Sequence, residues 1–238
     1  MKMHLTRVIP RPAERIDAGD DAGLRWLRSE YEPHAERSVR LNMITSLTGS
    51  ATGADGTSDT LSSPVDRRIL GVIRGWSDVV VVGAQSVRAE RYVVPKRTRL
   101  AIVTRTGRLE GHQLAPDDDT ARVVLVCAEH DADTVRSNSE GLGLDVIAVA
   151  GDELEPSRVL SAFADRGWLR VVCEGGPTLA SQFARAGVID EFCVSVAPQL
   201  VPATAPFIRV PDGHTLAAPH GLLVDDSGFS YLRARPSA

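Results

Sequence analysis

Several features are scarce in this sequence of 238 residues, and each absence excludes a class of protein. No apolar run approaches the ~20 residues that a membrane-spanning helix needs. Residues 1–12 lack the continuous apolar stretch of a secretory signal peptide. Positive charge is not in excess, since 31 Asp and Glu residues outnumber 27 Lys and Arg and give a net charge of −4. These absences argue against a membrane or nucleic-acid partner, and we expect a cytoplasmic protein that binds a small molecule.

Cysteine is also rare, with Cys127, Cys173 and Cys193 far apart in the chain. Each lies within or at the end of an apolar, strand-like run, which is typical of a reduced, buried thiol rather than of a disulfide. His34 and Glu36 match half of a zinc-deaminase motif, but the paired cysteines that complete that motif are absent. We therefore expect no metal site.

Short apolar runs recur through the middle of the chain and alternate with segments of helical periodicity. The runs are residues 39–44, 79–82, 100–103, 123–127, 146–149 and 169–173. Ser63 followed by Pro64 is typical of a helix start, because serine caps the first turn and proline fits its first position. This alternation predicts an α/β fold with a mostly parallel sheet flanked by helices.

Both ends of the chain depart from this pattern. Near the C-terminus, apolar segments at 192–196, 222–224 and 229–232 predict antiparallel edge strands, with a hairpin turn at 226–228. At the other end, residues 1–38 are polar and rich in turn-forming residues, with one short helix expected at 22–27. We expect residues 1–38 to be an extension packed on a main domain of residues 39–238.

Three polar turns follow predicted strands, and ligands bind beyond the carboxyl ends of the strands in an open α/β sheet. The strongest signal is Gly175-Gly176 before a predicted helix, where backbone amides and the helix dipole favour an anion. A plain tight turn explains the two glycines equally well.

The other two turns give weaker signals. Gly83 and Ser86 follow the second apolar run, where a cofactor could pass close to the backbone, although an ordinary strand-to-helix connector fits as well. Thr104 and Arg105 suit a phosphate monoester such as the 2′-phosphate of NADPH. An exposed arginine is more often only a solvated charge.

Taken together, these turns resemble the reductase domain of the bacterial riboflavin-biosynthesis deaminase-reductase and, more closely, the standalone pyrimidine reductases. The matching segments are LNMITSLTGSATGADGTSDTLSSPVDRRILGVIRGWSDVVVVGAQSVRAERY, LAIVTRTGRL, CEGGPTLASQFARAGVIDEFCVSVAPQLV and DDSGFSYLRARP, in family order. The resemblance implies a dihydrofolate-reductase-like fold, NADPH as cofactor and a homodimer. In that family a hydride passes to C1′ of a ribosylaminopyrimidine phosphate and opens the sugar to a ribityl chain.

The resemblance also implies roles for individual residues. The cofactor-binding positions are Gly83, Ser86, Val87, Thr104, Arg105, Gly175, Gly176, Pro177 and Thr178. The substrate-binding positions are Asn42, Ser46, Thr48, Glu90 and Glu174, although Glu90 fits a surface acid equally well. The catalytic acid stays open between water and Glu174.

Two departures from the family pattern fall on the substrate side. Thr48 stands where the family carries aspartate, and Arg91 stands where it often carries a second acid. A hydroxyl cannot hold the negative charge of a carboxylate. Three hypotheses follow: an NADPH-dependent reductase of a pyrimidine-type substrate, a same-fold reductase of another heterocycle such as a dihydropterin, and a non-catalytic NADP-binding homologue.

Overall fold

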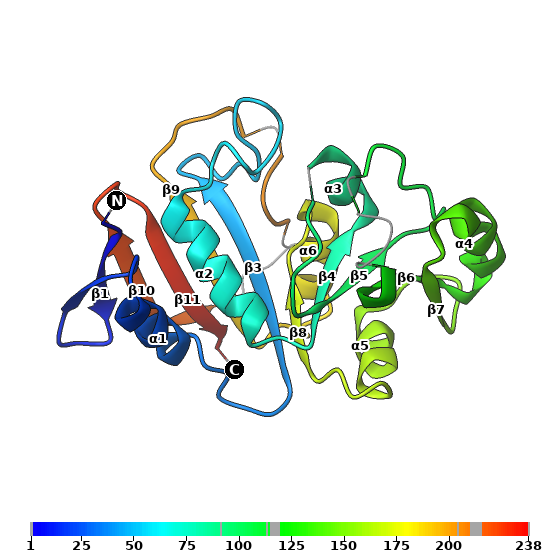
Figure 1. Cartoon of the computed structure of the whole chain (residues 1–238), viewed down its shortest axis with the longest axis horizontal. Coiled ribbons are helices and arrows are strands. Elements are labelled where there is room, and N and C mark those ends of the chain that lie inside the picture. Colours follow the sequence, from blue (N-terminus) through cyan, green and yellow to red (C-terminus); the bar gives the residue numbers. More distant parts are fainter. Residues whose placement is uncertain are drawn as a thin grey trace.

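A single mixed sheet runs through the part of the chain that the computed structural model describes, residues 2–90, 92–112, 114, 120–203, 205–209 and 216–237 (Figure 1). Within these residues the sheet has eleven strands in the order β2-β1-β10-β11-β9-β3-β8-β4-β5-β6-β7. No helix of the described residues is long and apolar enough to cross a membrane.

The strands are β1 (His4–Ile9), β2 (Glu14–Asp17), β3 (Ser38–Ser46), β4 (Val79–Gly83), β5 (Arg99–Val103), β6 (Val123–Ala128), β7 (Asp145–Val149), β8 (Arg170–Cys173), β9 (Glu191–Ala197), β10 (Ala217–Asp225) and β11 (Ser230–Pro236). The helices are α1 (Asp21–Glu30), α2 (Pro64–Gly75), α3 (Ala84–Ala89), α4 (Ala132–Ser139), α5 (Pro156–Ala164) and α6 (Pro177–Arg185), with three short 3₁₀ turns, η1 (Thr120–Arg122), η2 (Glu129–Asp131) and η3 (Glu140–Leu142).

The predicted fold class is confirmed. Strands β3 to β8 pair in parallel, and β10 and β11 pair antiparallel at the other side of the sheet. Ser63 caps α2 and Pro64 occupies its first turn, as the sequence indicates. The three cysteines are free and buried.

The expected direction of β9 is wrong in one respect. This strand pairs antiparallel with β11, but it runs parallel to β3 through seven register pairs. The reason is helix α6, which connects β8 to β9 and returns the chain to the same end of the sheet. A helical crossover of this kind produces parallel strands.

The N-terminal segment contains more structure than its sequence indicates. Helix α1 confirms the predicted helix, and its Leu27 is fully buried. The preceding residues form β1 and β2, which extend the sheet beyond β10 and were not predicted. Both strands are short, with polar residues on both faces, so their period-2 signal is weak.

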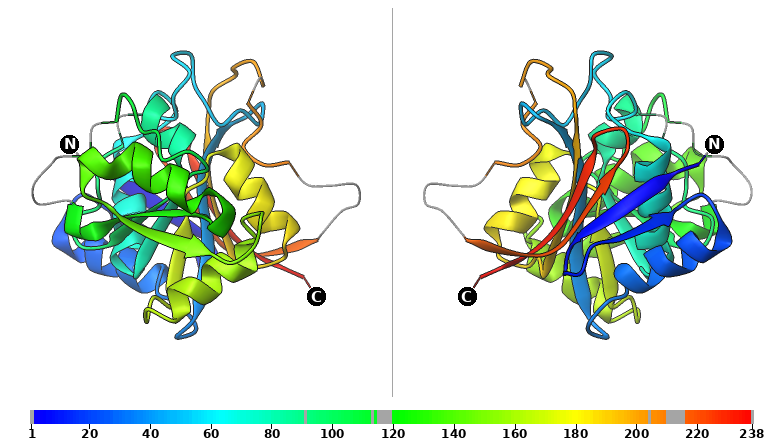
Figure 2. Two further views of the ribbon diagram at one scale, coloured as in Figure 1. Left: turned by 90° about the vertical axis from the view of Figure 1, so that its right-hand side faces the viewer. Right: turned by 90° about the vertical axis from the view of Figure 1, so that its left-hand side faces the viewer.

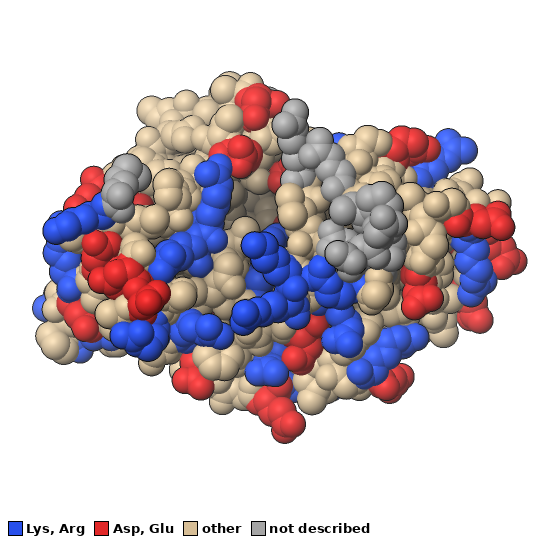
Figure 3. Space-filling view, in the orientation of Figure 1, with Lys and Arg blue, Asp and Glu red and all other residues tan. Residues whose placement is uncertain are grey.

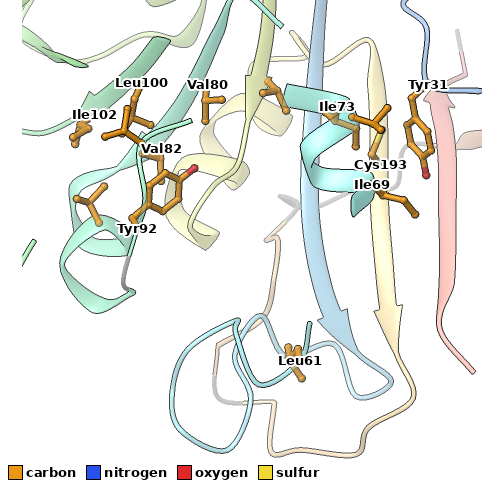
Figure 4. Packing of buried hydrophobic residues seen from close by; sticks show 14 of the residues in the cluster. Tyr31, Leu61, Ile69, Ile73, Val80, Val82, Tyr92, Leu100, Ile102 and Cys193 are labelled. Carbon is orange, nitrogen blue, oxygen red and sulfur yellow. The ribbon is translucent and has the colours of Figure 1, made fainter. Parts of the chain in front are cut away.

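Helices cover both faces of the sheet (Figure 2). The core cluster on one face includes residues of α1, α2, α3 and α4, whereas the cluster on the other face includes α5 and α6. Figure 4 shows how the first cluster is divided: side chains of β4 and β5 gather on one side, and those of α2 and β9 on the other. The candidate site lies on this α2 face.

A buried ion pair joins β3 to its parallel neighbour β9. Arg40 and Glu191 are register partners, their Nε and Oε2 atoms are 2.5 Å apart, and both side chains are at most 6% exposed. Arg40 also donates to the carbonyl of Tyr31 at 2.7 Å, which ties the end of α1 to the sheet. Burial lowers the pKa of the nearby His220, so Arg40 rather than His220 supplies the positive charge beside Glu191 at neutral pH.

Replacing Arg40 should therefore destabilise the protein strongly. We expect Arg40→Met to lower the free energy of unfolding by about 3–5 kcal/mol, because Glu191 would stay buried without a counter-charge. Urea denaturation followed by circular dichroism measures this difference. The matched control is Arg67→Met, which removes an exposed partner of Asp59 and should cost at most about 1 kcal/mol. Equal losses in the two variants would contradict the role given to the buried pair.

Candidate active site

The sheet opens at the carboxyl end of β8. Strand β8 pairs with β3 only as far as Leu41 and Cys173, whereas β3 continues to Ser46. Beyond Leu41 the edge of β3 therefore no longer pairs with β8. In the space-filling view the surface is hollowed between α2 and α3, and Lys and Arg side chains gather below the hollow (Figure 3).

The paired glycines form a turn against the start of α3. The Gly83 amide donates to the carbonyl of Gly175 at 2.8 Å, and the Gly176 amide donates to Ser86 Oγ at 3.1 Å. The peptide bond between Gly175 and Gly176 is cis. The structure thus brings together four of the residues that the sequence assigned to cofactor binding.

Side chains would not fit this turn. Gly175 has φ of +79°, a conformation that favours glycine, and a Cβ atom there would lie 2.4 Å from Met43 Sδ. A Cβ atom on Gly176 would lie 2.7 Å from Ser86 Oγ. The close packing of this turn against the side chains of Met43 and Ser86 thus favours glycine at both positions.

Helix α6 begins directly after this turn. Gly176 is its N-cap and has no side chain to cap the helix, and Pro177 has no amide hydrogen. The amides of Thr178 and Leu179 belong to the first turn and have no acceptor inside the helix. Thr178 is exposed. An anion can be bound here by backbone amides and the positive end of the helix dipole.

The remaining cofactor positions occupy different environments. Val87 is fully buried in the core, so its side chain packs against apolar residues. The buried Thr104 hydroxyl accepts hydrogen bonds from the amides of Thr106 at 3.2 Å and Gly107 at 3.0 Å, which shapes the turn after β5. Arg105 in that turn is exposed.

Glu174 is held by two residues that the sequence analysis missed. Arg74 Nε donates to Oε1 at 2.7 Å and Arg74 Nη2 donates to Oε2 at 2.6 Å, so both carboxylate oxygens are bound. The Tyr92 hydroxyl donates to Oε2 and accepts a bond from Arg74 Nη2 at 2.9 Å. The three side chains converge from the end of α2, the end of β8 and the segment after α3.

Burial and charge shape this triad. Burial by itself would lower the pKa of Arg74, but the charge and hydrogen bonds of Glu174, and then those of Tyr92, raise it above its usual value. The pKa of Tyr92 is raised first by burial and then by the Glu174 charge. Tyr92 is therefore a neutral hydrogen-bonding group, and Arg74 with Glu174 forms a fixed ion pair.

The other predicted substrate residues lie around the loop that follows β3. Ser46 Oγ lies 2.8 Å from Thr48 Oγ1, and Thr48 donates to the carbonyl of Val201. Glu90 accepts from the hydroxyl of Ser58 at 2.8 Å and from its amide at 3.3 Å, which ties this loop to the end of α3.

Asn42 completes the set. It is half-buried and lies four residues before Ser46, so both project from the same face of β3. Arg91, the other departure from the family pattern, lies outside the described residues. Neither Arg74 nor Tyr92 carries a sequence signal, because an arginine late in an amphipathic helix and a tyrosine in a polar loop are common.

Comparisons with known proteins identify the family of this chain. The RibD C-terminal domain family matches residues 37–216. The riboflavin biosynthesis protein RibD of Mycobacterium tuberculosis is 33% identical over 198 residues, covering 81% of this chain and 51% of that protein. The chain thus spans about half the length of this curated relative.

Solved structures share the fold. A pyrimidine reductase-like protein from Corynebacterium diphtheriae superimposes with a TM-score of 0.75 at 22% identity, covering 85% of this chain and 92% of that one. The riboflavin biosynthesis reductase Rib7 of Saccharomyces cerevisiae gives a TM-score of 0.67 at 14% identity, covering 90% and 99% of the two chains. The match over residues 37–216, together with the 33% identity, shows that the chain belongs to the RibD C-terminal domain family.

Proposed function

We propose that this protein is an NADPH-dependent reductase of a pyrimidine-type substrate. The reaction is transfer of a hydride to C1′ of a ribosylaminopyrimidine phosphate, which opens the sugar ring to a ribityl chain. The observation that carries the proposal is the Gly175–Gly176 turn, fixed by Gly83 and Ser86, between the N-terminus of α6 and the Glu174 triad. Hydride transfer depends mainly on the proximity and orientation of two bound molecules, and this cleft offers a surface for each.

The cofactor half of the cleft fits a dinucleotide. The backbone of the Gly175–Gly176 turn is not covered by side chains of its own, because both glycines lack Cβ atoms. The amides of Thr178 and Leu179 would hold the pyrophosphate, and the exposed Arg105 would pair with the 2′-phosphate that distinguishes NADPH. When bound, NADPH supplies the hydride.

The substrate half combines a fixed ion pair with hydroxyl and amide groups. Glu174 and Tyr92 can orient a heterocycle that carries N–H donors and carbonyl acceptors, because Arg74 holds both in place. Asn42 and Ser46 would contact the substrate from β3. Thr48 in place of aspartate keeps a second candidate open, a same-fold reductase of another heterocycle.

The family resemblance also bears on the oligomeric state and the location of the protein. We propose a homodimer in the cytoplasm. Light scattering measures the oligomeric state in solution.

The direct test of the cofactor site is titration with NADPH, followed by nicotinamide fluorescence. We expect saturable binding in the micromolar range and at least about a 10-fold loss of affinity in Gly175→Ala, because the added methyl group would collide with Met43. The matched control is Gly187→Ala at the other end of α6, which also has positive φ (+64°) but has no atom within 4 Å of the place that its added methyl group would take. No binding at high micromolar NADPH would remove the proposal.

The substrate site is tested by Glu174→Gln. We expect kcat/KM for the ribosylaminopyrimidine phosphate to fall about 10- to 150-fold, the equivalent of the about 1.5–3 kcal/mol that a charged hydrogen bond contributes. The affinity for NADPH should stay unchanged. Glu129→Gln, at an exposed glutamate that directly follows β6, serves as the control. If the wild-type protein reduces a dihydropterin and not the pyrimidine, the second candidate replaces the first.

A further inference from the structure

Asp66 is a carboxyl group on the α2 face that the site described so far does not use. It lies in the first turn of α2, and its Oδ2 accepts a hydrogen bond from Ser62 Oγ at 2.9 Å. Ser195 of β9 also lies close enough for its hydroxyl to lower the pKa of this carboxyl group. The residue keeps part of its surface exposed, although its carboxyl group is desolvated.

Helix capping does not account for this carboxyl group. An acid three residues after the N-cap commonly accepts from the N-cap amide in a capping box. Here one half of that box is present, because the Asp66 amide donates to the hydroxyl of Ser63 at 3.0 Å. The returning bond, from the Ser63 amide to the Asp66 carboxyl group, is not formed among the described residues. The Asp66 carboxyl group instead faces the hydroxyls of Ser62 and Ser195, away from the cap.

The register of the sheet places Asp66 level with the predicted substrate residues, one strand away from them. Its partner Ser195 is the register partner of Ile44 on β3. Asn42 and Ser46 lie two residues before and after Ile44 and share its face. Ile44 is only partly buried, and β8 has already ended at this level, so the edge of β3 away from β9 no longer pairs with β8 here.

The surroundings of Asp66 favour its protonated form. Burial is the largest cause and raises its pKa above the ordinary 3.8, whereas the hydrogen bonds of Ser195 and Ser62 and the charge of Arg67 lower it. Asp225 of β10 acts in the opposite direction and raises it. Asp225 in turn accepts a hydrogen bond from the Tyr231 hydroxyl at 2.8 Å. The charged and titratable groups near Asp66 therefore include Arg67, Asp225 and Tyr231.

The contrast with Glu174 indicates a division of roles. Both oxygens of Glu174 accept hydrogen bonds from Arg74, which fixes the orientation of this side chain. Asp66 has hydroxyl partners instead, and Arg67 is directed to Asp59 at 2.8 Å. Two carboxyl groups in such different environments suit two different tasks.

We propose that Asp66 is the catalytic acid of this cleft and contacts the substrate at the nitrogen bonded to C1′. The inference rests on the proposed function. The cyclic substrate is an isomer of an open-chain imine with a C1′=N double bond. Addition of a hydride at C1′ breaks the π bond and leaves its electron pair on nitrogen. Asp66 gives its proton to that nitrogen and becomes a carboxylate, and water later returns a proton to it, so the product is the secondary amine of the ribityl chain.

The first experiment compares the wild-type protein with Asp66→Asn in single-turnover NADPH oxidation between pH 5 and 9. Asparagine keeps the shape of the side chain but cannot transfer a proton, so we expect a 10²- to 10⁴-fold slower hydride step, about the range of general acid catalysis. The wild-type rate should fall as the pH rises through the pKa of Asp66, and the variant should lose this dependence. NADPH affinity should be equal in both. The control is Asp21→Asn, the same change in the first turn of α1, which should match the wild type.

The outcomes separate the inference from the proposed function. If the wild-type protein oxidises NADPH with the substrate and Asp66→Asn does so within about 3-fold and with the same pH dependence, the inference alone is wrong. If the wild-type protein binds NADPH but never oxidises it with this substrate, the proposed reaction fails and the role of Asp66 in it fails too.

A second measurement needs no turnover. The folded-state pKa of Asp66 is raised, so the folded protein is favoured by protonation, and this contribution is lost as the pH rises through that pKa. Asparagine resembles the protonated form. We expect Asp66→Asn to melt at a higher temperature than the wild type at neutral pH, with the difference shrinking as the pH falls towards 3.8. A lower melting temperature at neutral pH would show that Asp66 is a stabilising carboxylate and would overturn the inference.

Discussion

Two hydrogen bonds between the Gly175–Gly176 turn and the start of α3 hold the candidate site together. They join the end of β8 to the end of β4, directly before the first turn of α6. The turn packs closely against Met43 of β3 at Gly175 and against Ser86 of α3 at Gly176, which explains why both positions favour glycine. A binding surface made of backbone is rigid at the outset, so little ordering is needed when a ligand arrives.

Desolvation of charged groups gives three different results in this molecule. Arg40 and Glu191 are buried as a pair and join strands β3 and β9. Arg74 and Glu174 are paired at the edge of the cleft, where a fixed carboxylate can orient a ligand. Asp66 is desolvated among hydroxyls, and its pKa rises because burial outweighs its hydrogen bonds. The partner of each carboxyl group thus decides whether it remains charged or keeps a proton.

Much of the architecture could be predicted from short segments. The four consecutive valines of β4 and the Ser63-Pro64 start of α2 carry their information locally, in apolar runs and capping residues. The Gly175-Gly176 pair likewise marked the turn after β8. The strands β1 and β2 escaped prediction because their apolar pattern is too short, and the direction of β9 depended on where α6 returns the chain.

The sequence by itself determined the fold class, the capped start of α2 and the Gly175-Gly176 turn after β8, because these depend on residues close together in the chain. Only the tertiary structure decided the partners of the carboxyl groups. Arg74 is 100 residues from Glu174 in the sequence. Ser195 lies on β9, whereas its register partner Ile44 lies on β3 and its neighbour Asp66 lies on α2. Propensity and periodicity act over a few residues, whereas contacts between side chains distant in sequence are set by strand order and register.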